Sequence, residues 1–398
     1  MKNISLLTTK YPVDPTSPWL TNELALAMRD SGHNVTVVAL SWMPDDPENG
    51  VAMESGIKVV RVRLPSFFYK RMRIVTGLKI LLFPLIARFY IKKHVKVCDL
   101  LVANTPCVTI LGLTRFFRRR YGAKSFLVCW DFFPFYLKDL GLVSNKFSFE
   151  VLRVIERTMY KSFDKIGCMT NRNIDFLQQN YDFSSLAKVC KLPIWATIKS
   201  APMISKADIR TKFGLPQDKV LAVFGGAMSI VQDLRNLLIL AEHSKELNVT
   251  FVLIGSGTER NDLIAQVRER SIDNIIFLDA IPRFEYEKLL QACDIGLIFL
   301  SHKLTVPSFP SKSLDYFKLS LPILAGLDAF TDFGGILLNE AKAGYFAQAD
   351  NTVALKKLLG ELVNDGDLRK RLGENGRVFY EAEFDVEDAK EAIISVVN

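Results

Sequence analysis

The segment 306–326, VPSFPSKSLDYFKLSLPILAG, brings serine, lysine and aspartate together at spacings that suit a phosphorylated ligand. Ser308 and Ser311 are good N-cap residues, and a helix that begins near Ser311 would direct free backbone N–H groups and its positive dipole end at an anion. Lys312 adds a full charge there, and Asp315 follows one helical turn later, where it could accept hydrogen bonds from a diol such as a ribose. The same sequence is also typical of an ordinary capped helix with an exposed lysine and aspartate, so both interpretations stay open.

Two glycine pairs follow apolar runs that predict buried strands, KVLAVFGG and VTFVLIGSG. Gly225 and Gly226 would let the backbone approach a phosphate closely, with φ values that other residues avoid. Gln232 is expected to open the next helix, where its amide could meet the ligand. Gly255 and Gly257 form a weaker version of the same device, because a Gly-x-Gly turn after a strand is often only a tight connection to a helix.

These residues must be positioned by a repeated strand–helix alternation. A chain of 398 residues has the length of two domains, and buried apolar runs separated by helix-length stretches are typical of α/β proteins with parallel sheets. We expect a first domain over 1–195, a linker without apolar periodicity over 196–209, and a second domain over 210–375. The last helix, over 376–398, could pack on either domain.

Composition limits the partners and the chemistry. The 51 Lys and Arg outnumber the 43 Asp and Glu, and the resulting charge of +8 favours anionic partners such as phosphates, phospholipids or nucleic acid. The six cysteines include no CxxC pair and the chain has four histidines, which predicts neither a zinc site nor a disulfide framework. Reduced thiols in a cytosol are the default for such a pattern, and the short apolar run at 4–7 reads as a buried strand, not as a signal peptide.

Residues 67–98 carry basic side chains among large apolar ones. A transmembrane helix needs roughly 20 nearly uncharged residues, whereas Lys79, Pro84 and Arg88 interrupt this run. A helix that lies in the membrane interface, with Lys and Arg toward anionic headgroups, fits the composition better. Helices that flank a sheet with a solvated basic face are the alternative. The basic residues of the stretch include Arg71, and a second basic patch in the same half comprises Arg115, Arg118, Arg119 and Arg120.

The segment 306–326 resembles the signature region of glycosyltransferase family 4, where a Glu-x7-Glu pair flanks the start of a helix. Pro307 stands where the first acidic residue usually lies, and Asp315 stands where the second does. The run Pro310, Ser311 and Lys312 is similar to a subgroup of bacterial O-antigen, capsule and exopolysaccharide pathways. CWDFFPFYLKDLGLV, which begins at Cys129, resembles the Asp-Leu-Trp-Pro element of that subgroup and implies that Asp131 reaches the cleft from the first domain.

Other segments resemble the same subgroup in the same order along nearly the whole chain: VIERTMYKSFDKIGCMT, LPIW and FGGAMSIVQDLRNLL. The resemblance implies a GT-B fold, with two Rossmann-like domains whose parallel sheets face an interdomain cleft. It implies retaining transfer of a sugar from a nucleotide-diphosphate sugar to a lipid-linked or saccharide acceptor, without a metal or other cofactor. We expect a cytoplasmic protein, peripheral at the inner face of the plasma membrane, that binds an anionic membrane surface and no nucleic acid.

The predicted site divides into three sets of residues. Asp131 and Lys312 are predicted to be catalytic. The residues predicted to bind the donor nucleotide and its phosphates are Gly225, Gly226, Gln232, Gly255, Gly257, Ser308, Ser311, Lys312 and Asp315. The first loop replaces the double glycine of many family members with bulkier residues and is predicted to shape an acceptor pocket through Tyr11, Ser17 and Trp19.

The chain departs from the family between the first glycine pair and Gln232, where a basic residue is usual and 228–231 read MSIV. Either Lys312 and helix N-termini carry the diphosphate without that residue, or another basic residue substitutes for it. Two rival functions remain: a nucleotide-sugar 2-epimerase of similar architecture, and a catalytically dead homologue that acts as a membrane-associated scaffold. A nicotinamide dehydrogenase is disfavoured because no full GxGxxG follows a strand.

Overall fold

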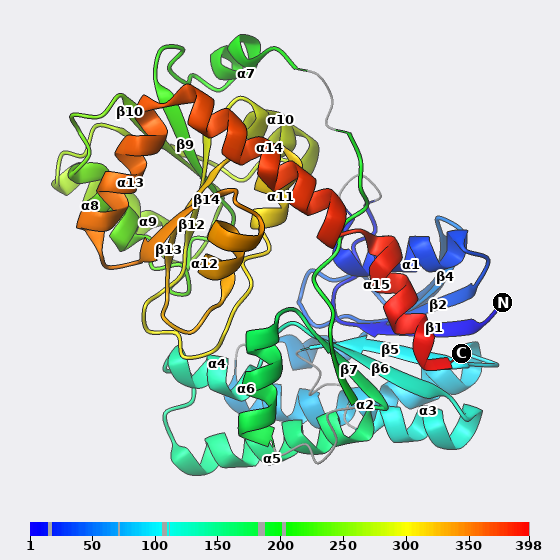
Figure 1. Cartoon of the computed structure of the whole chain (residues 1–398). Helices are drawn as coiled ribbons and strands as arrows, with labels where there is room; N and C mark the ends of the chain where they lie inside the picture. The colour runs from blue at the N-terminus through cyan, green and yellow to red at the C-terminus, as the bar shows by residue number, and fades with distance from the viewer. Residues whose placement is uncertain are drawn as a thin grey trace. The chain divides into compact units, whose positions relative to one another are not determined.

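The computed structural model of the chain describes residues 1–14, 18–70, 72–105, 110, 112–181, 188–200 and 204–397. Among the residues singled out above, Ser17 and Arg71 lie outside this part of the chain, as does Cys107, one of the six cysteines. The chain divides into two compact units: unit 1 comprises Met1–Thr197 and Asp385–Asn398, and unit 2 comprises Ile198–Phe384 (Figure 1).

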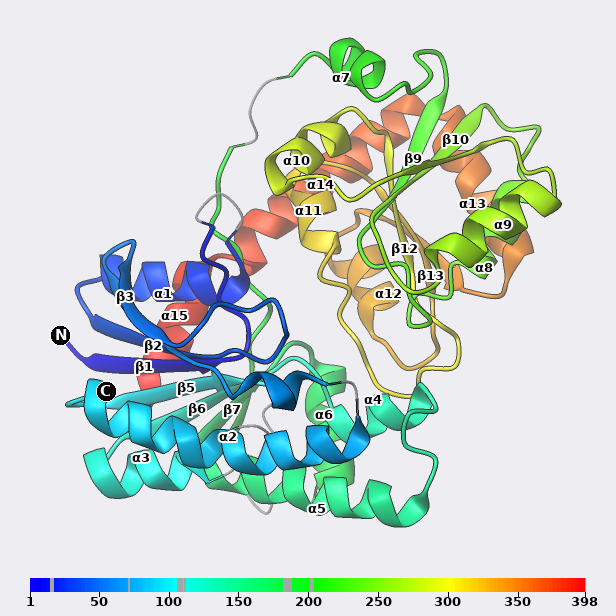
Figure 2. The same ribbon diagram turned by 180° about the vertical axis from the view of Figure 1, so that it is seen from behind.

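Unit 1 contains an eight-stranded sheet with helices on both faces (Figures 1 and 2). Its strands are β1 (Asn3–Thr8), β2 (Asn34–Leu40), β3 (Gly50–Glu54), β4 (Ile57–Val62), β5 (Leu100–Asn104), β6 (Lys124–Cys129), β7 (Lys165–Cys168) and β8 (Val189–Lys191). Its helices are α1 (Leu20–Asp30), η1 (Ser66–Tyr69), α2 (Arg73–His94), α3 (Leu113–Tyr121), α4 (Phe133–Asp139), α5 (Lys146–Ser162), α6 (Asn171–Tyr181), α15 (Val386–Ile394) and η5 (Ser395–Val397). The strand order is β3-β4-β2-β1-β5-β6-β7-β8.

The strand order of unit 1 reverses direction between β1 and β5. From β1 the chain builds outward through β2 and β4, and from β5 it builds outward on the other side through β6, β7 and β8. Ligands of open parallel sheets bind beyond the carboxyl ends of the strands at such a switch point. Thr8, Asn104 and Cys129, the last residues of β1, β5 and β6, therefore mark the edge of this sheet where a ligand is expected.

The hairpin of β3 and β4 is the one antiparallel pairing in this sheet within the described residues, and the sequence pattern did not predict β3. Ser55 and Gly56 connect the two strands with φ values of 48° and 75°, as a two-residue turn of type I′ requires. Strand β3 lies at the sheet edge and its residues are largely exposed, so it lacks the buried apolar run that marked the other strands.

Unit 2 contains a six-stranded parallel sheet in the order β11-β10-β9-β12-β13-β14. Its strands are β9 (Val220–Gly225), β10 (Val249–Ile254), β11 (Ile275–Leu278), β12 (Ile295–Phe299), β13 (Ile323–Leu327) and β14 (Gly344–Gln348). Its helices are α7 (Lys206–Lys212), α8 (Arg235–Glu242), α9 (Arg260–Glu269), α10 (Arg283–Gln291), α11 (Ser313–Lys318), α12 (Phe333–Gly335), η4 (Ile336–Glu340), α13 (Thr352–Asn364) and α14 (Gly366–Glu383). The switch point lies between β9 and β12.

The ends of unit 2 differ from the expected linker and last helix. Helix α7 begins at Lys206, inside the expected linker, and Arg210 ties it to unit 2 by donating from Nε to the Ala292 carbonyl at 2.9 Å. The single helix expected over 376–398 is two helices, α14 and α15. Asp385 caps α15 by accepting from the Glu387 N–H at 3.0 Å, and Val386 donates to the Ala196 carbonyl at 3.0 Å.

Helix α15 completes the core of unit 1. Its Ile393 is fully buried in the same apolar cluster as Ile4 and Leu24, and Lys390 donates from Nζ to the Ser31 hydroxyl at 2.6 Å. Burial of an isoleucine side chain of this kind contributes roughly 1.5–3 kcal/mol. The last residues of the chain are thus part of the fold of the first unit.

The two glycine turns of unit 2 pack directly against each other beyond β9 and β10. Gly226 donates to the Ile254 carbonyl at 2.9 Å, and Met228 donates to the Ser256 carbonyl at 2.8 Å. Gly255 has a φ of 141° and Gly257 a φ of 156°. A Cβ at Gly255 would lie 2.1 Å from the Gly226 carbonyl oxygen, so this close backbone contact requires glycine.

We expect Gly255→Ala to lower the free energy of unfolding by about 2–4 kcal/mol, because the methyl group meets a backbone oxygen and the φ suits only glycine. Chemical denaturation with a spectroscopic signal measures this change. Gly360→Ala is the matched control: Gly360 lies inside α13, where an added Cβ meets nothing closer than the Leu247 side chain at 4.0 Å, and alanine there should add about 0.5–1 kcal/mol. Equal effects of the two substitutions would contradict the packing argument.

Candidate functional site

Lys312 lies against the first glycine turn of unit 2. Its Nζ is 3.7 Å from the centroid of the Phe224 ring, and its Cε would be 4.0 Å from a Cβ built on Gly226. The side chain is half-buried, and desolvation lowers the pKa of its ammonium group to about 7. Within the described residues no carboxylate forms an ion pair with it. A bound anion would raise this pKa again, because an opposite charge favours the protonated form.

Gly225 is surrounded by two tyrosines. A Cβ on Gly225 would lie 1.9 Å from the Tyr286 hydroxyl, and the Gly225 N–H donates to the Tyr316 hydroxyl at 3.4 Å. The Tyr316 hydroxyl lies 3.1 Å from the Val223 carbonyl, to which it can donate. The tyrosines thus fix the end of β9, and Tyr316 comes from the same short helix as Asp315.

The helix of the 306–326 segment begins later than predicted, and neither serine caps it. Helix α11 runs from Ser313 to Lys318, its N-cap residue is Lys312, and no side chain caps it. The Ser313 N–H donates to the Pro310 carbonyl at 2.9 Å, so a backbone turn replaces the expected side-chain cap. Ser308 donates instead to the Val306 carbonyl at 3.4 Å, and Ser311 is exposed.

Asp315 is engaged by a residue that the sequence did not indicate. Arg283, the first residue of α10, donates from Nη1 to Asp315 Oδ2 at 2.8 Å and from Nη2 to Asp315 Oδ1. This is a two-point pairing of a guanidinium with a carboxylate. Any ligand hydroxyl that reaches Asp315 must therefore share its carboxylate with Arg283.

Gln232 lies in a turn before α8, which begins at Arg235, so it does not open the helix as predicted. Its Oε1 accepts from the Ser229 hydroxyl at 2.7 Å. The Ser301 N–H, beyond β12, donates to the Val231 carbonyl at 2.7 Å and holds the loop after β12 beside this turn. His302 Nδ1 then lies 3.8 Å from an Asp233 carboxylate oxygen.

In unit 1, Asp131 follows the carboxyl end of β6. The Thr105 hydroxyl beyond β5 accepts from the Trp130 N–H at 2.8 Å and from the Asp131 N–H at 2.9 Å. The Asp131 side chain reaches solvent, yet desolvation by the surrounding protein raises its pKa to about 6. Asp131 is therefore largely ionised at neutral pH and close to its titration range.

Glu156 on α5 is a buried carboxyl group that the sequence did not single out. It is 1% exposed, its Oε1 accepts from the Phe133 N–H at 3.1 Å, and its Oε2 accepts from the Tyr181 hydroxyl. Burial raises its pKa to about 7, partly offset by the hydrogen bonds it accepts. Glu156 thereby anchors the start of α4, directly after Asp131.

The first loop only partly resembles the predicted acceptor loop. Tyr11 is 8% exposed and belongs to the core of unit 1, where burial raises the pKa of its hydroxyl to about 12. Trp19 is the N-cap residue of α1 and is half-buried, with Lys10 Nζ 3.3 Å from its ring centroid. Tyr11 thus has little surface for an acceptor, whereas Lys10 and Trp19 lie beyond the carboxyl end of β1.

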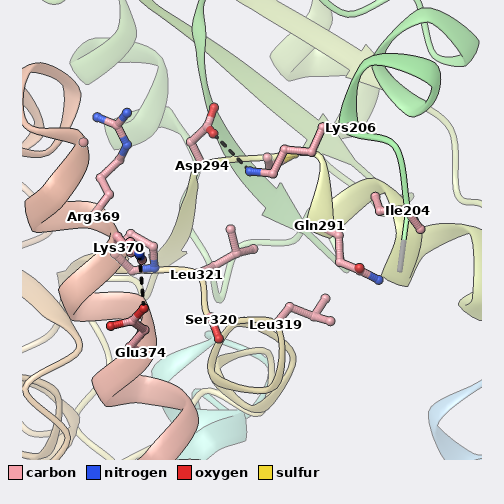
Figure 3. A pocket seen from close by; sticks show the side chains of 13 residues that line it. Ile204, Lys206, Gln291, Asp294, Leu319, Ser320, Leu321, Arg369, Lys370 and Glu374 are labelled. Carbon is pink, nitrogen blue, oxygen red and sulfur yellow. Dashed lines mark ion pairs between the residues drawn. The ribbon is translucent and has the colours of Figure 1, made fainter. Parts of the chain in front are cut away.

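A cavity of about 650 Å³ in unit 2 is lined by none of the predicted site residues (Figure 3). Asp294 and Leu321, which precede β12 and β13, line it, so it lies at the opposite edge of the sheet. Four of its charged side chains form two ion pairs: Lys206 lies 3.5 Å from Asp294, and Lys370 lies 4.0 Å from Glu374. Among the described residues, no group of three or more His, Cys, Asp or Glu side chains could hold a metal ion.

Comparison with known proteins supplies the family. Residues 205–379 match the glycosyl transferases group 1 family. The chain is 23% identical over 269 residues to the probable glycosyltransferase WbjE of Pseudomonas aeruginosa, with 66% of each chain covered. It is 25% identical over 175 residues to O-antigen chain mannosyltransferase C of Escherichia coli, with 44% of this chain and 45% of that one covered. The crystal structure of WaaG, a glycosyltransferase involved in lipopolysaccharide biosynthesis, matches with a TM-score of 0.70 at 16% identity, over 99% of both chains.

The matches to WbjE and to the mannosyltransferase span less than two thirds of the length of those relatives, whereas the match to WaaG covers the fold from end to end. The predicted resemblance and the predicted GT-B fold are confirmed. The chain has the GT-B fold of two Rossmann-like units, and its residues 205–379 match the glycosyl transferases group 1 family.

Proposed function

We propose that the protein transfers a sugar, with retention of anomeric configuration, from a nucleotide-diphosphate sugar to a lipid-linked or saccharide acceptor in the synthesis of a bacterial surface polysaccharide. The observation that carries this proposal is the Lys312 ammonium beside Gly226 at the switch point between β9 and β12. The names of two relatives support the pathway, since one acts on O-antigen chains and another is involved in lipopolysaccharide biosynthesis.

The donor half of the reaction needs a site for a departing diphosphate. Cleavage of the sugar–phosphate bond builds negative charge on the leaving group, and one well-placed donor to such a charge contributes roughly 3–4 kcal/mol. Lys312 is assigned to this charge, with the Gly225–Gly226 backbone and the Ser311 hydroxyl as neutral partners. Gly255 and Gly257 contribute to diphosphate binding indirectly. They allow the turn after β10 to pack against the Gly225–Gly226 turn and support it.

The acceptor half is assigned to Asp131. A carboxylate that accepts or orients the acceptor hydroxyl proton must be ionised, and a pKa of about 6 keeps Asp131 ionised at neutral pH while leaving it basic enough to act. Asp315 is assigned to the ribose of the donor. Retention would convert an α-linked donor into an α-linkage in the product.

We further propose that α2 binds the anionic inner surface of the plasma membrane. Leu78, Leu81, Leu85 and Phe89 recur on one face of α2 and are 43%, 61%, 55% and 67% exposed, whereas Phe83, Ala87 and Ile91 face the core. Lys92 and Lys93 are exposed at the end of the apolar face. An exposed apolar stripe that ends in cationic side chains complements acyl chains and anionic headgroups. No helix within the described residues is long and apolar enough to span a bilayer.

Lys312→Met should weaken binding of a nucleoside diphosphate by roughly tenfold to a hundredfold, because a charged hydrogen bond to the phosphates is lost. Isothermal calorimetry with UDP, GDP, CDP and dTDP measures this change. Lys370→Met removes a lysine of α14 whose side chain is 76% exposed and should leave the affinity unchanged. A scaffold without a donor site would bind none of the four in a Lys312-dependent manner.

Asp131→Asn should lower the transfer rate by about 10²–10⁴ and leave nucleotide affinity intact. Transfer is measured by mass spectrometry with a panel of nucleotide sugars and lipid-diphosphate-sugar acceptors. In the wild type the rate should fall as the pH falls through about 6, where Asp131 gains a proton, and the variant should lack this acid limb. A 2-epimer formed from the donor in the absence of any acceptor would point to the epimerase instead.

A triple substitution of Leu81, Leu85 and Phe89 by serine should reduce co-sedimentation with vesicles of phosphatidylcholine and phosphatidylglycerol by about tenfold or more, because each side chain loses part of a transfer free energy of roughly 1.5–3 kcal/mol. A double substitution of Val353 and Val378 by serine is the control, since these residues of unit 2 are 82% and 67% exposed. Wild-type protein that stays in the supernatant, or a triple variant that sediments like wild type, would refute membrane binding through α2.

A further inference from the structure

Arg283 is held by carboxylates on three of its N–H groups. Both of its terminal nitrogens bond the Asp315 carboxylate, and its Nε lies 3.2 Å from Glu287 Oε1. A guanidinium has five N–H donors in a fixed plane, so this pairing fixes the plane of the guanidinium and with it the plane of the Asp315 carboxylate.

A second ion pair links the same two helices one turn further along. Lys318 Nζ lies 3.0 Å from both carboxylate oxygens of Glu287. Helix α10 is thus joined to α11 at two points, by Arg283 with Asp315 and by Lys318 with Glu287. The pair that involves Asp315 remains partly accessible, with side-chain exposures of 37% for Arg283 and 15% for Asp315.

The Arg283–Asp315 pair lies near the turn formed by Gly225 and Gly226. Tyr286, one turn after Arg283, is the residue whose hydroxyl would meet a Cβ on Gly225. Lys312 precedes Asp315 by one turn and lies beside Gly226. A nucleotide whose phosphates reach Lys312 would therefore place its ribose near Asp315.

The charges decide which role Arg283 plays. Its positive charge is shared between two carboxylates, which leaves little net charge for binding a phosphate, whereas Lys312 has no carboxylate partner among the described residues. An ionised carboxylate has about four acceptor positions, and Arg283 uses one on each oxygen. One position on each oxygen of Asp315 is left for a ligand.

We infer that Arg283 is a positioning residue for donor recognition: it orients the Asp315 carboxylate to accept hydrogen bonds from the ribose hydroxyls and offsets a negative charge that would otherwise repel the diphosphate. This inference rests on the proposed function, because it assumes a nucleotide donor at this site. It assigns Arg283 a role in selecting ribonucleotides over their deoxy forms.

The test compares nucleotides with and without the ribose hydroxyls. Calorimetry measures the dissociation constants of UDP and GDP and of their 2′-deoxy and 3′-deoxy forms. Loss of a hydroxyl that bonds a carboxylate should weaken wild-type binding by about tenfold or more. Arg283→Met should bring the ratio of the deoxynucleotide to the ribonucleotide dissociation constant close to one, chiefly because the ribonucleotide binds more weakly.

The matched control is Lys318→Met, which removes the other link between α10 and α11 and leaves Asp315 with Arg283. It should lower the melting temperature to a similar extent and keep the ribo-to-deoxy preference. Arg283→Lys, which keeps the charge without the planar fork, should retain the affinity for phosphate and lose most of the preference, and it replaces Arg283→Met if that variant does not fold.

Two outcomes overturn the inference alone: wild-type protein that binds UDP or GDP through Lys312 without any ribose preference, or folded Arg283 variants that keep the wild-type preference. Wild-type protein that binds none of these nucleotides in a Lys312-dependent manner overturns the proposed function and the inference together.

Discussion

The surroundings of Lys312 in unit 2 depend on one backbone contact, the approach of Gly255 to the carbonyl oxygen of Gly226. The contact exists because neither turn carries a side chain where the two meet, and it fixes the end of β9 against the end of β10. Phe224 and Gly226 then form the surface on which Lys312 rests. Among the described residues no carboxylate pairs with Lys312, so an anion that binds there would favour its protonated form.

The sequence predicted the parallel strands well, because buried strands appear as uninterrupted apolar runs such as those of β9 and β10. The same criterion overlooked β3 and β14, whose residues alternate or are exposed at sheet edges. Helix ends were predicted less accurately. The start of α11 is set by a backbone turn at Pro310, so the two serines that looked like caps have no such role.

The contacts of some site residues could be predicted from the sequence, and those of others could not. Lys312 and the glycines follow motifs that are local in the chain, and their neighbours are set by the order of the strands. The partners of Asp315 and of the segment after Asp131 are not local: Arg283 precedes Asp315 by 32 positions and Glu156 follows Phe133 by 23. Such pairings depend on how two helices are aligned, which no motif records.

The return of α15 to the first unit has a consequence for how the polypeptide acquires its structure. Lys2 donates to the carbonyl of Val397 across 395 positions of sequence, and Ile4 shares a core with Ile393. During synthesis, every residue of the second unit has left the ribosome before the first unit can close its hydrophobic interior. The part of the protein that is translated first is therefore the part that matures last, and until then its exposed apolar surface is what a chaperone would recognise.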